Sequence, residues 1–203
     1  MRAIRVITIS VATVVLSLLA GSTIGVAGQD AEPVGAFHEA PPLPAAANGH
    51  ASIGLDDGRV LVVGGLETAT DVRLWDPATE TWTIGEPTAR PRTESTAVRL
   101  PDGRVLISGG VDDTGTTVGS AEIWDPSTDS SSIVGSTLEA KASHSGTMLP
   151  DGRVLLAGGV TIDPESRSTT SLASAEIWDP RAAGFEGTGD LATARYGHTA
   201  TLV

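Results

Sequence analysis

Acidic side chains are concentrated in three segments of the sequence that stand at equivalent places in a repeated pattern. Carboxylate oxygens in such segments could bind Ca²⁺ or attract a basic partner. No Asp-x-Asp-x-Asp-Gly run is present, so a calcium-loop motif is not supported. Solvated loop acids on an acidic protein are the simpler interpretation, and a binding face is the functional one. The candidate binding residues are Glu67, Asp71, Asp112, Asp113, Asp163 and Glu165.

Three histidines, His50, His144 and His198, also recur at equivalent positions. Three imidazoles could bind zinc or copper. A histidine at a repeated position more often bonds neighbouring backbone and packs at a junction between repeats. Equivalent residues of neighbouring repeats also lie too far apart for shared ligand bonds of roughly 2 Å. The sequence therefore predicts no metal site, no other cofactor and no catalytic residue, and it offers no partner for His38.

The amino-acid composition excludes several kinds of functional site and of binding partner. The 203 residues include no cysteine, which excludes disulfides, thiolate metal sites and a cysteine nucleophile within them. The formal net charge is −12. A surface of that sign repels nucleic-acid phosphates and anionic lipid headgroups, so neither is an expected partner. Cations, neutral sugars and basic proteins are compatible with it.

Residues 1–27 have the organisation of a secretory signal peptide. Arg2 and Arg5 precede an apolar stretch from Val6 to about Ala20, and small residues then lead to Ala27, after which we expect cleavage. An uncleaved membrane anchor is the alternative, but the apolar stretch is short for a span of roughly 20 residues. We therefore predict export to an extracellular or periplasmic location, without a membrane contact after cleavage. Residues 28–36 are expected to be a short linker.

The rest of the sequence repeats itself three times. Each copy has an Asp-Gly-Arg turn, an apolar segment that ends in Gly-Gly, and a later Trp-Asp-Pro, which together predict four short strands. The segment before Gly-Gly is apolar on both faces, so we expect it to be buried on both sides. Two glycines without side chains let neighbouring backbone approach closely. The structural repeat residues are Gly64, Gly65, Gly109, Gly110, Gly158, Gly159, Trp75, Trp124 and Trp178.

Length varies among the copies between Gly-Gly and the tryptophan. This gap is 10 positions from Gly65 to Trp75, 14 from Gly110 to Trp124 and 19 from Gly159 to Trp178. In a four-stranded antiparallel meander these gaps and the links between copies lie at the same end. Loops of variable length on one face of a rigid scaffold are where binding usually resides. We therefore expect this face to be the functional surface.

These motifs resemble the kelch-repeat family, in which a strand ending in Gly-Gly precedes an aromatic-Asp-Pro and a further aromatic residue. The resemblance implies an all-β propeller of four-stranded antiparallel blades over residues 37–203. The three complete blades are expected at about 50–86, 95–135 and 144–189. Blade 2 departs from the family pattern, because Ser131 stands where the later aromatic residue is expected. WD40 propellers are the alternative, but they lack the regular Gly-Gly, and either family implies a β-propeller.

Three complete blades are fewer than the about 4 to 8 blades of a closed propeller. Flanking strands are expected around Phe37 and at 198–203. Open edges carry unpaired backbone groups, so we expect either that the sequence is part of a longer chain or that the edges self-associate.

The expected function is non-catalytic binding of a protein or carbohydrate. The alternative is a fragment of an extracellular copper oxidoreductase similar to galactose oxidase and glyoxal oxidase. That resemblance implies a tyrosine cross-linked to a cysteine, whereas these residues include one tyrosine and no cysteine.

Overall fold

The computed structural model describes residues 39–66 and 69–203. These residues form fourteen β-strands and no helix, so the all-β prediction is confirmed. None of them belongs to a helix that is long and apolar enough to cross a membrane. The expected signal peptide and linker, Phe37, His38 and Glu67 lie outside the described residues.

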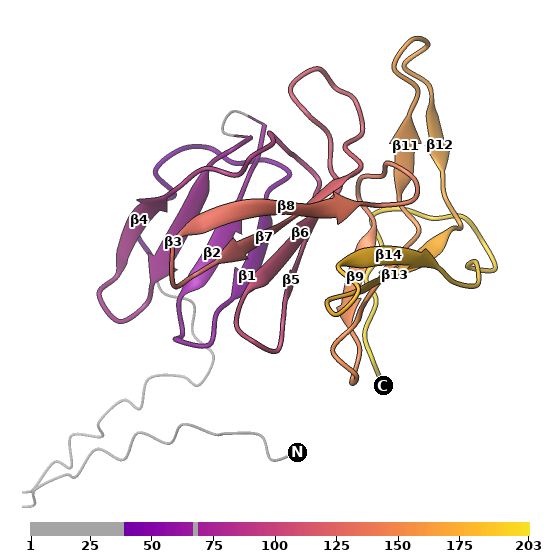
Figure 1. The fold of residues 1–203 in the computed structure, drawn as a ribbon. Helices are drawn as coiled ribbons and strands as arrows, with labels where there is room; N and C mark the ends of the chain where they lie inside the picture. The colour runs from indigo at the N-terminus through magenta and orange to yellow at the C-terminus, as the bar shows by residue number, and fades with distance from the viewer. Residues whose placement is uncertain (1–38, 67–68) are drawn as a thin grey trace, which may run out of the picture. The chain divides into compact units, whose positions relative to one another are not determined.

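Three antiparallel four-stranded sheets, one for each sequence repeat, form the body of the structure (Figure 1). In each sheet the strands pair in chain order, so each is a meander, and we call them blades 1, 2 and 3. Blade 1 contains β1 (Ala51–Gly54), β2 (Val60–Val63), β3 (Val72–Asp76) and β4 (Thr81–Gly85). Blade 2 contains β5 (Thr96–Arg99), β6 (Val105–Ser108), β7 (Ser120–Asp125) and β8 (Ser130–Ser136). Blade 3 contains β9 (Ser145–Met148), β10 (Val154–Ala157), β13 (Ala175–Asp179) and β14 (Gly184–Gly187).

The other two strands, β11 (Val160–Ile162) and β12 (Thr169–Ser171), form a hairpin inserted between β10 and β13. Figure 1 shows this hairpin projecting from blade 3 on the same side as the loop between β6 and β7. The sequence predicted only a long loop here, because two strands of three residues, one of them Thr-Thr-Ser, carry almost no periodic signal.

Aspartate side chains fix the tight turns between strands. Asp57 Oδ1 accepts the backbone N–H of Arg59 at 3.0 Å, and Gly58 between them has a φ of +91°, which glycine adopts without strain. The Asp-Pro turns before β4, β8 and β14 use the same device, with each aspartate accepting a backbone N–H at 2.8 Å. The other aspartates in these two sets of turns are Asp102, Asp151, Asp76, Asp125 and Asp179.

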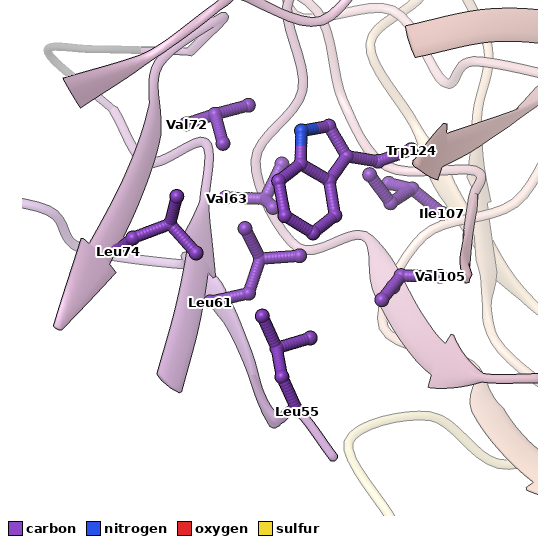
Figure 2. Packing of buried hydrophobic residues seen from close by; sticks show 8 residues of the cluster. All are labelled: Leu55, Leu61, Val63, Val72, Leu74, Val105, Ile107 and Trp124. Atoms are coloured by element: carbon purple, nitrogen blue, oxygen red, sulfur yellow. The ribbon is translucent and has the colours of Figure 1, made fainter. Parts of the chain in front are cut away.

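Blades 1 and 2 pack against each other through one shared hydrophobic core (Figure 2). Blade 2 contributes Val105, Ile107 and Trp124 to this core, and the indole of Trp124 is turned toward Val63 and Leu61 of blade 1. Trp124 has no exposed surface. Because truncating a buried tryptophan typically costs about 3–5 kcal/mol, this one side chain contributes substantially to the contact between the two blades.

The same packing recurs between blades 2 and 3, where Trp178 is only 1% exposed. Trp75 occupies the equivalent position in blade 1, but it is half-buried, because no preceding blade covers it among the described residues. Its ring instead lies 5.2 Å from that of Trp82, centroid to centroid. The tryptophan at this position of the repeat is therefore fully buried only where a preceding blade covers it.

The first strands of the three blades are adjacent, since β5 contacts both β1 and β9. Residues 198–203 were expected to form one more such strand, but the structure assigns no strand there. They lie beside β9, where Thr147 Oγ1 donates to the carbonyl oxygen of Ala200 at 3.4 Å. No further strand pairs with their other side among the described residues, so this segment lacks the ladder of backbone hydrogen bonds that defines a strand.

Candidate binding site on the loop face

The Gly-Gly pairs hold the links, which are the segments between the last strand of one blade and the first strand of the next. The Gly110 N–H donates to the carbonyl of Lys141 at 2.9 Å, and the Gly159 N–H donates to that of Arg195 at 2.8 Å. A Cβ on Gly158 would lie 2.5 Å from the Arg195 oxygen, which leaves no room for any side chain. Glycine is required here because the backbone of the next link occupies the space.

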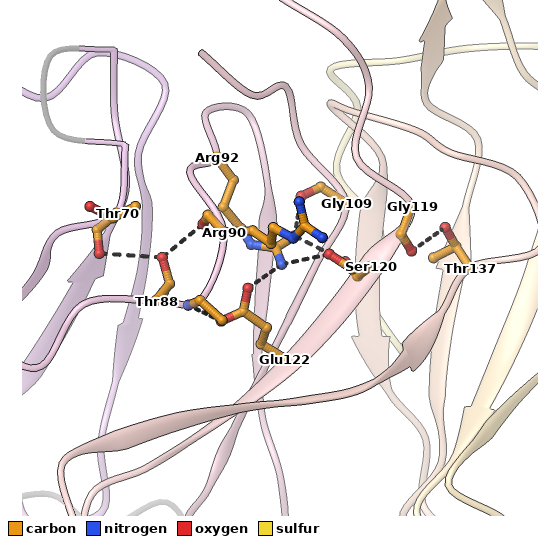
Figure 3. Close-up of polar contacts among 10 residues, drawn as sticks. Thr70, Thr88, Arg90, Arg92, Gly109, Gly119, Ser120, Glu122 and Thr137 are labelled. Atoms are coloured by element: carbon orange, nitrogen blue, oxygen red, sulfur yellow. Dashed lines mark hydrogen bonds and ion pairs between the residues drawn. The ribbon is translucent and has the colours of Figure 1, made fainter. Parts of the chain in front are cut away.

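A buried ion pair fastens the link 86–95 to blade 2 (Figure 3). The side chains of Arg92 and Glu122 are both 0% exposed, and Arg92 Nη2 donates to Glu122 Oε1. The other carboxylate oxygen accepts the backbone N–H of Ala89 at 2.8 Å. Arg92 Nη1 donates to the carbonyls of Gly109 and Ser120 at 2.8 and 2.9 Å. The attraction between the two charges and these hydrogen bonds thus offset most of the free-energy cost of removing both side chains from water. The same bonds fix the position of the link on blade 2.

Blade 3 repeats this arrangement, with Lys141 Nζ 2.7 Å from Glu176 Oε1. Blade 1 departs from it, because Arg73 stands at the position of the glutamate. The Arg73 side chain is 1% exposed, and its Nη2 lies 2.9 Å from Asp71 Oδ2. Asp71 therefore neutralises a buried guanidinium of its own blade, and it is not a free carboxylate for a ligand.

Two of the three repeated histidines, His144 and His198, contact different blades. His144 Nε2 lies 3.0 Å from Ser108 Oγ in blade 2, and His198 Nε2 lies 3.1 Å from Ser145 Oγ in blade 3. His50 is exposed. In the described part of the chain, no three His, Cys, Asp or Glu side chains are grouped closely enough to hold a metal ion.

Burial changes the acid–base behaviour of His144. Desolvation, followed by the positive charge of Lys141 and the proximity of His198, lowers the pKa of His144 to about 3. The imidazole is therefore neutral at physiological pH, and it acts as a packing and hydrogen-bonding group between blades.

The three loops of different length all leave the blades at the end where the links cross, and we call this end the loop face (Figure 1). The first loop is 64–71, the middle loop is 109–119 and the third loop, which contains the β11–β12 hairpin, is 158–174. They share one end because each connects the second strand of its blade's four-stranded sheet to the third. The three connections of different length therefore share one end of the blades, as the gap lengths predicted.

Asp112 holds the middle loop in shape. Its Oδ1 accepts the backbone N–H groups of Thr114 and Thr116 at 3.0 and 2.9 Å. Burial by itself would raise the pKa of Asp112, but the hydrogen bonds from Thr114 and Thr116 and the charge of Arg167 outweigh it and lower the pKa. Asp113 beside it is exposed, and none of the described residues donates a hydrogen bond to its carboxylate. The two neighbouring aspartates thus differ, since the first organises the loop and the second has an exposed carboxylate that no described residue hydrogen-bonds.

Arg167, near the tip of the β11–β12 hairpin, joins the third loop to the middle loop. Its Nη1 donates to the carbonyl of Gly115 at 3.0 Å, and its Nη2 donates to that of Thr114 at 2.7 Å. Lower in the hairpin, the Ile162 N–H donates to Thr117 Oγ1 at 3.4 Å. The space between the second and third blades is therefore bridged at the loop face by the protein itself.

Two cavities open beside the middle loop. The larger, of about 500 Å³, lies between this loop and the link 86–95, and we call it the link cavity. It is lined by Arg90, Pro91, Asp112, Asp113, Thr114, Val118, Gly119 and Ser120. The smaller, of about 270 Å³, lies between the first and middle loops, and we call it the inter-loop cavity. It is lined by Leu66, Ala69, Thr93, Val111, Asp112, Asp113 and Gly115.

The structure brings two of the six predicted acidic residues, Asp112 and Asp113, to these cavities, and it places Asp71, Asp163 and Glu165 elsewhere. Asp112 and Asp113 line both cavities. Asp163 Oδ1 accepts the backbone N–H groups of Glu165 and Ser166 at 3.0 and 2.7 Å, so it shapes the hairpin turn. Asp71 pairs with Arg73, as described above, and Glu67 lies outside the described residues.

The sequence reasoning missed the buried ion pairs and the Arg167 contact. A signal for the ion pairs was present, because Arg92 and Lys141 each stand four positions before the first residue of the next blade's first strand. The partner glutamates, Glu122 and Glu176, precede Ile-Trp in both later copies. Aligning the repeats with one another for charge would have indicated both pairs, whereas Arg167 lies in a segment without a counterpart in the other copies.

Comparisons with known proteins define the fold of this chain. No protein-family model matches the sequence, and no curated protein matches it. Among solved structures, 191 chains match, and one of them is YjhT, a β-propeller, with a TM-score of 0.61 and 16% sequence identity. This match covers 75% of the present chain and 53% of YjhT, so the chain spans about half the length of that structure. The likeness shows the fold, and the chain is a β-propeller protein with three four-stranded blades among its described residues.

Proposed function

We propose that this chain is a secreted kelch-repeat propeller that binds a protein or carbohydrate through its loop face, without catalysis. The observation that carries the proposal is that both cavities beside the middle loop open on the face where the three blades differ in loop length. The signal-peptide pattern supports secretion, and the Gly-Gly and Trp-Asp-Pro pattern supports the kelch assignment.

A rigid base under variable loops is the physical reason that this face suits recognition. The link 86–95, which lines both cavities, is fixed by the buried Arg92–Glu122 pair, and the next link is fixed in the same way by the buried Lys141–Glu176 pair. A partner that contacts the middle loop therefore meets a base whose position is already fixed, and binding does not have to order the backbone beneath that loop. The copper-oxidoreductase alternative has no observation in its favour among the described residues.

The test is a binding screen of the purified protein against a defined array of neutral and charged oligosaccharides and a panel of purified acidic and basic proteins. We expect at least one saturable interaction that weakens when residues 160–174 are shortened to the length of the first loop, or when Asp113 is replaced by Asn. Thr128→Ala is a matched control, since Thr128 lies in the turn between β7 and β8, at the other end of the blade. Interactions that survive both loop-face changes but disappear in Thr128→Ala would contradict the proposal.

A further inference from the structure

The inter-loop cavity exists because the first loop is the shortest of the three. Between blades 2 and 3, the long third loop reaches across and bonds to the middle loop through Arg167 and through the Ile162 N–H. The first loop has only 10 positions from Gly65 to Trp75, and no described residue of it hydrogen-bonds to the middle loop. One side of the middle loop is thus covered by the protein, and the other side borders an open space of about 270 Å³.

The walls of this cavity combine apolar surface with negative charge. Leu66, which is 65% exposed, lines it together with Ala69 and Val111. Asp113 contributes an exposed carboxylate that receives no hydrogen bond from the described residues. A side chain with an aliphatic stem and a cationic end fits such a cavity, because the stem covers apolar surface while the charge meets the carboxylate.

The opposite side of the middle loop already binds a side chain of this type. Arg167 places its guanidinium on the carbonyls of Thr114 and Gly115, and its charge helps to lower the pKa of Asp112. The oxygen atoms of this loop thus suit a guanidinium, whose planar fork matches paired oxygen acceptors. Arg167 occupies the carbonyls on its own side, and the acceptor on the side of the inter-loop cavity is the carboxylate of Asp113. The whole chain carries a formal charge of −12, which favours approach of a basic partner on either side of the loop.

We propose that the inter-loop cavity is a docking site for an arginine side chain presented by a basic segment of another protein. The stem packs against Leu66 and Val111, and the guanidinium pairs with Asp113 at the rim. This inference rests on the proposed binding role of the loop face, and it names the chemical class of the partner.

The test uses the purified full chain and the capped peptide acetyl-Arg-Arg-Arg-amide, with the neutral citrulline analogue of the same peptide as a comparison. Binding is measured by titration calorimetry and by chemical-shift changes at low salt. We expect saturable binding of the arginine peptide that weakens as salt is raised and is absent for the citrulline peptide. Asp113→Asn should weaken binding about fivefold, the factor expected for one partly solvated ion pair. Leu66→Ser should also weaken it, through loss of packing with the stem.

Glu165→Gln is the matched control, because it removes one negative charge from the same face without touching the cavity. Equal weakening of peptide binding by Asp113→Asn and Glu165→Gln would mean that only the overall negative charge of the protein attracts the peptide, and it would overturn the inference. Equal binding of the citrulline peptide, or no saturable binding of the arginine peptide at millimolar concentration, would also overturn it. If array or protein ligands depend on the third loop while Asp113→Asn leaves them unchanged, this inference fails and the proposed function stands.

Discussion

Replacing Glu122 by Ala should be among the most destabilising single changes in the described part of the chain. The substitution removes a carboxylate that accepts hydrogen bonds from Arg92 and from the Ala89 N–H, and the side chains of Arg92 and Glu122 are both 0% exposed. Arg92 would remain buried without its counter-charge. Removing one partner of a buried pair typically costs about 3–5 kcal/mol, which is a large part of a total stability of about 5–15 kcal/mol.

Urea unfolding followed by circular dichroism gives the free energy of unfolding by linear extrapolation. Asp56→Ala is the matched control, because Asp56 pairs with Arg99 across a contact where both side chains are well exposed, at 66% and 40%. Such pairs contribute about 0–1 kcal/mol. Arg92→Met and the double variant complete a cycle, for which we expect a coupling energy of about 1–3 kcal/mol. The reasoning is refuted if Glu122→Ala costs no more than Asp56→Ala.

Three further outcomes follow from the same geometry. Gly109 has a φ of +61° and no space for a Cβ, so Gly109→Ala should lower the free energy of unfolding in urea by about 1–3 kcal/mol. Gly54→Ala is the control, because a Cβ there meets open space, and it should lower that free energy far less. Equal losses in the two variants would contradict the account of the Gly-Gly pairs. Because burial lowers the pKa of His144 to about 3, the unfolded chain binds its proton more readily, so stability should fall by up to about 1.4 kcal/mol per pH unit as pH drops from 6.5 toward 3. His144→Gln should flatten that slope, and an unchanged slope would show that other groups cause it. Arg167→Ala should speed amide hydrogen exchange in β11 and β12 with little change in global stability, and unchanged exchange would mean that the two bonds to the middle loop do not hold the hairpin.

Much of the fold could be predicted from the sequence because each blade is specified locally. The Asp-Gly turn before β2 needs only Asp57 and the positive φ of Gly58, and the apolar segment after it needs burial on both faces. Three copies of the same pattern then require side-by-side packing, since a single blade cannot bury its own apolar faces. The loop face followed in the same way, from the one place where the copies differ in length.

The candidate site was less predictable, because its chemistry depends on which residues meet across blades. From spacing alone, Asp71 and Asp113 were equivalent loop acids, yet Asp71 pairs with the buried Arg73 while Asp113 stays exposed beside a cavity. The cavity itself arises from a mismatch between the lengths of two neighbouring loops. A repeat pattern shows that the lengths differ but not which contacts are lost.

The sequence by itself determined the strand pattern, the turns, the repeat and the end of the molecule at which variation is found, because each depends on contacts within one blade or on the repetition of blades. Only the tertiary structure decided that Arg92 and Glu122 form a buried pair, that Arg167 closes one side of the middle loop, and that Trp75 is half-buried while Trp124 is fully buried. The physical reason is that burial and ion pairing are properties of the space between segments far apart in the chain. The contacts in that space depend on which blade or loop lies next to a residue, and the sequence around the residue does not specify this.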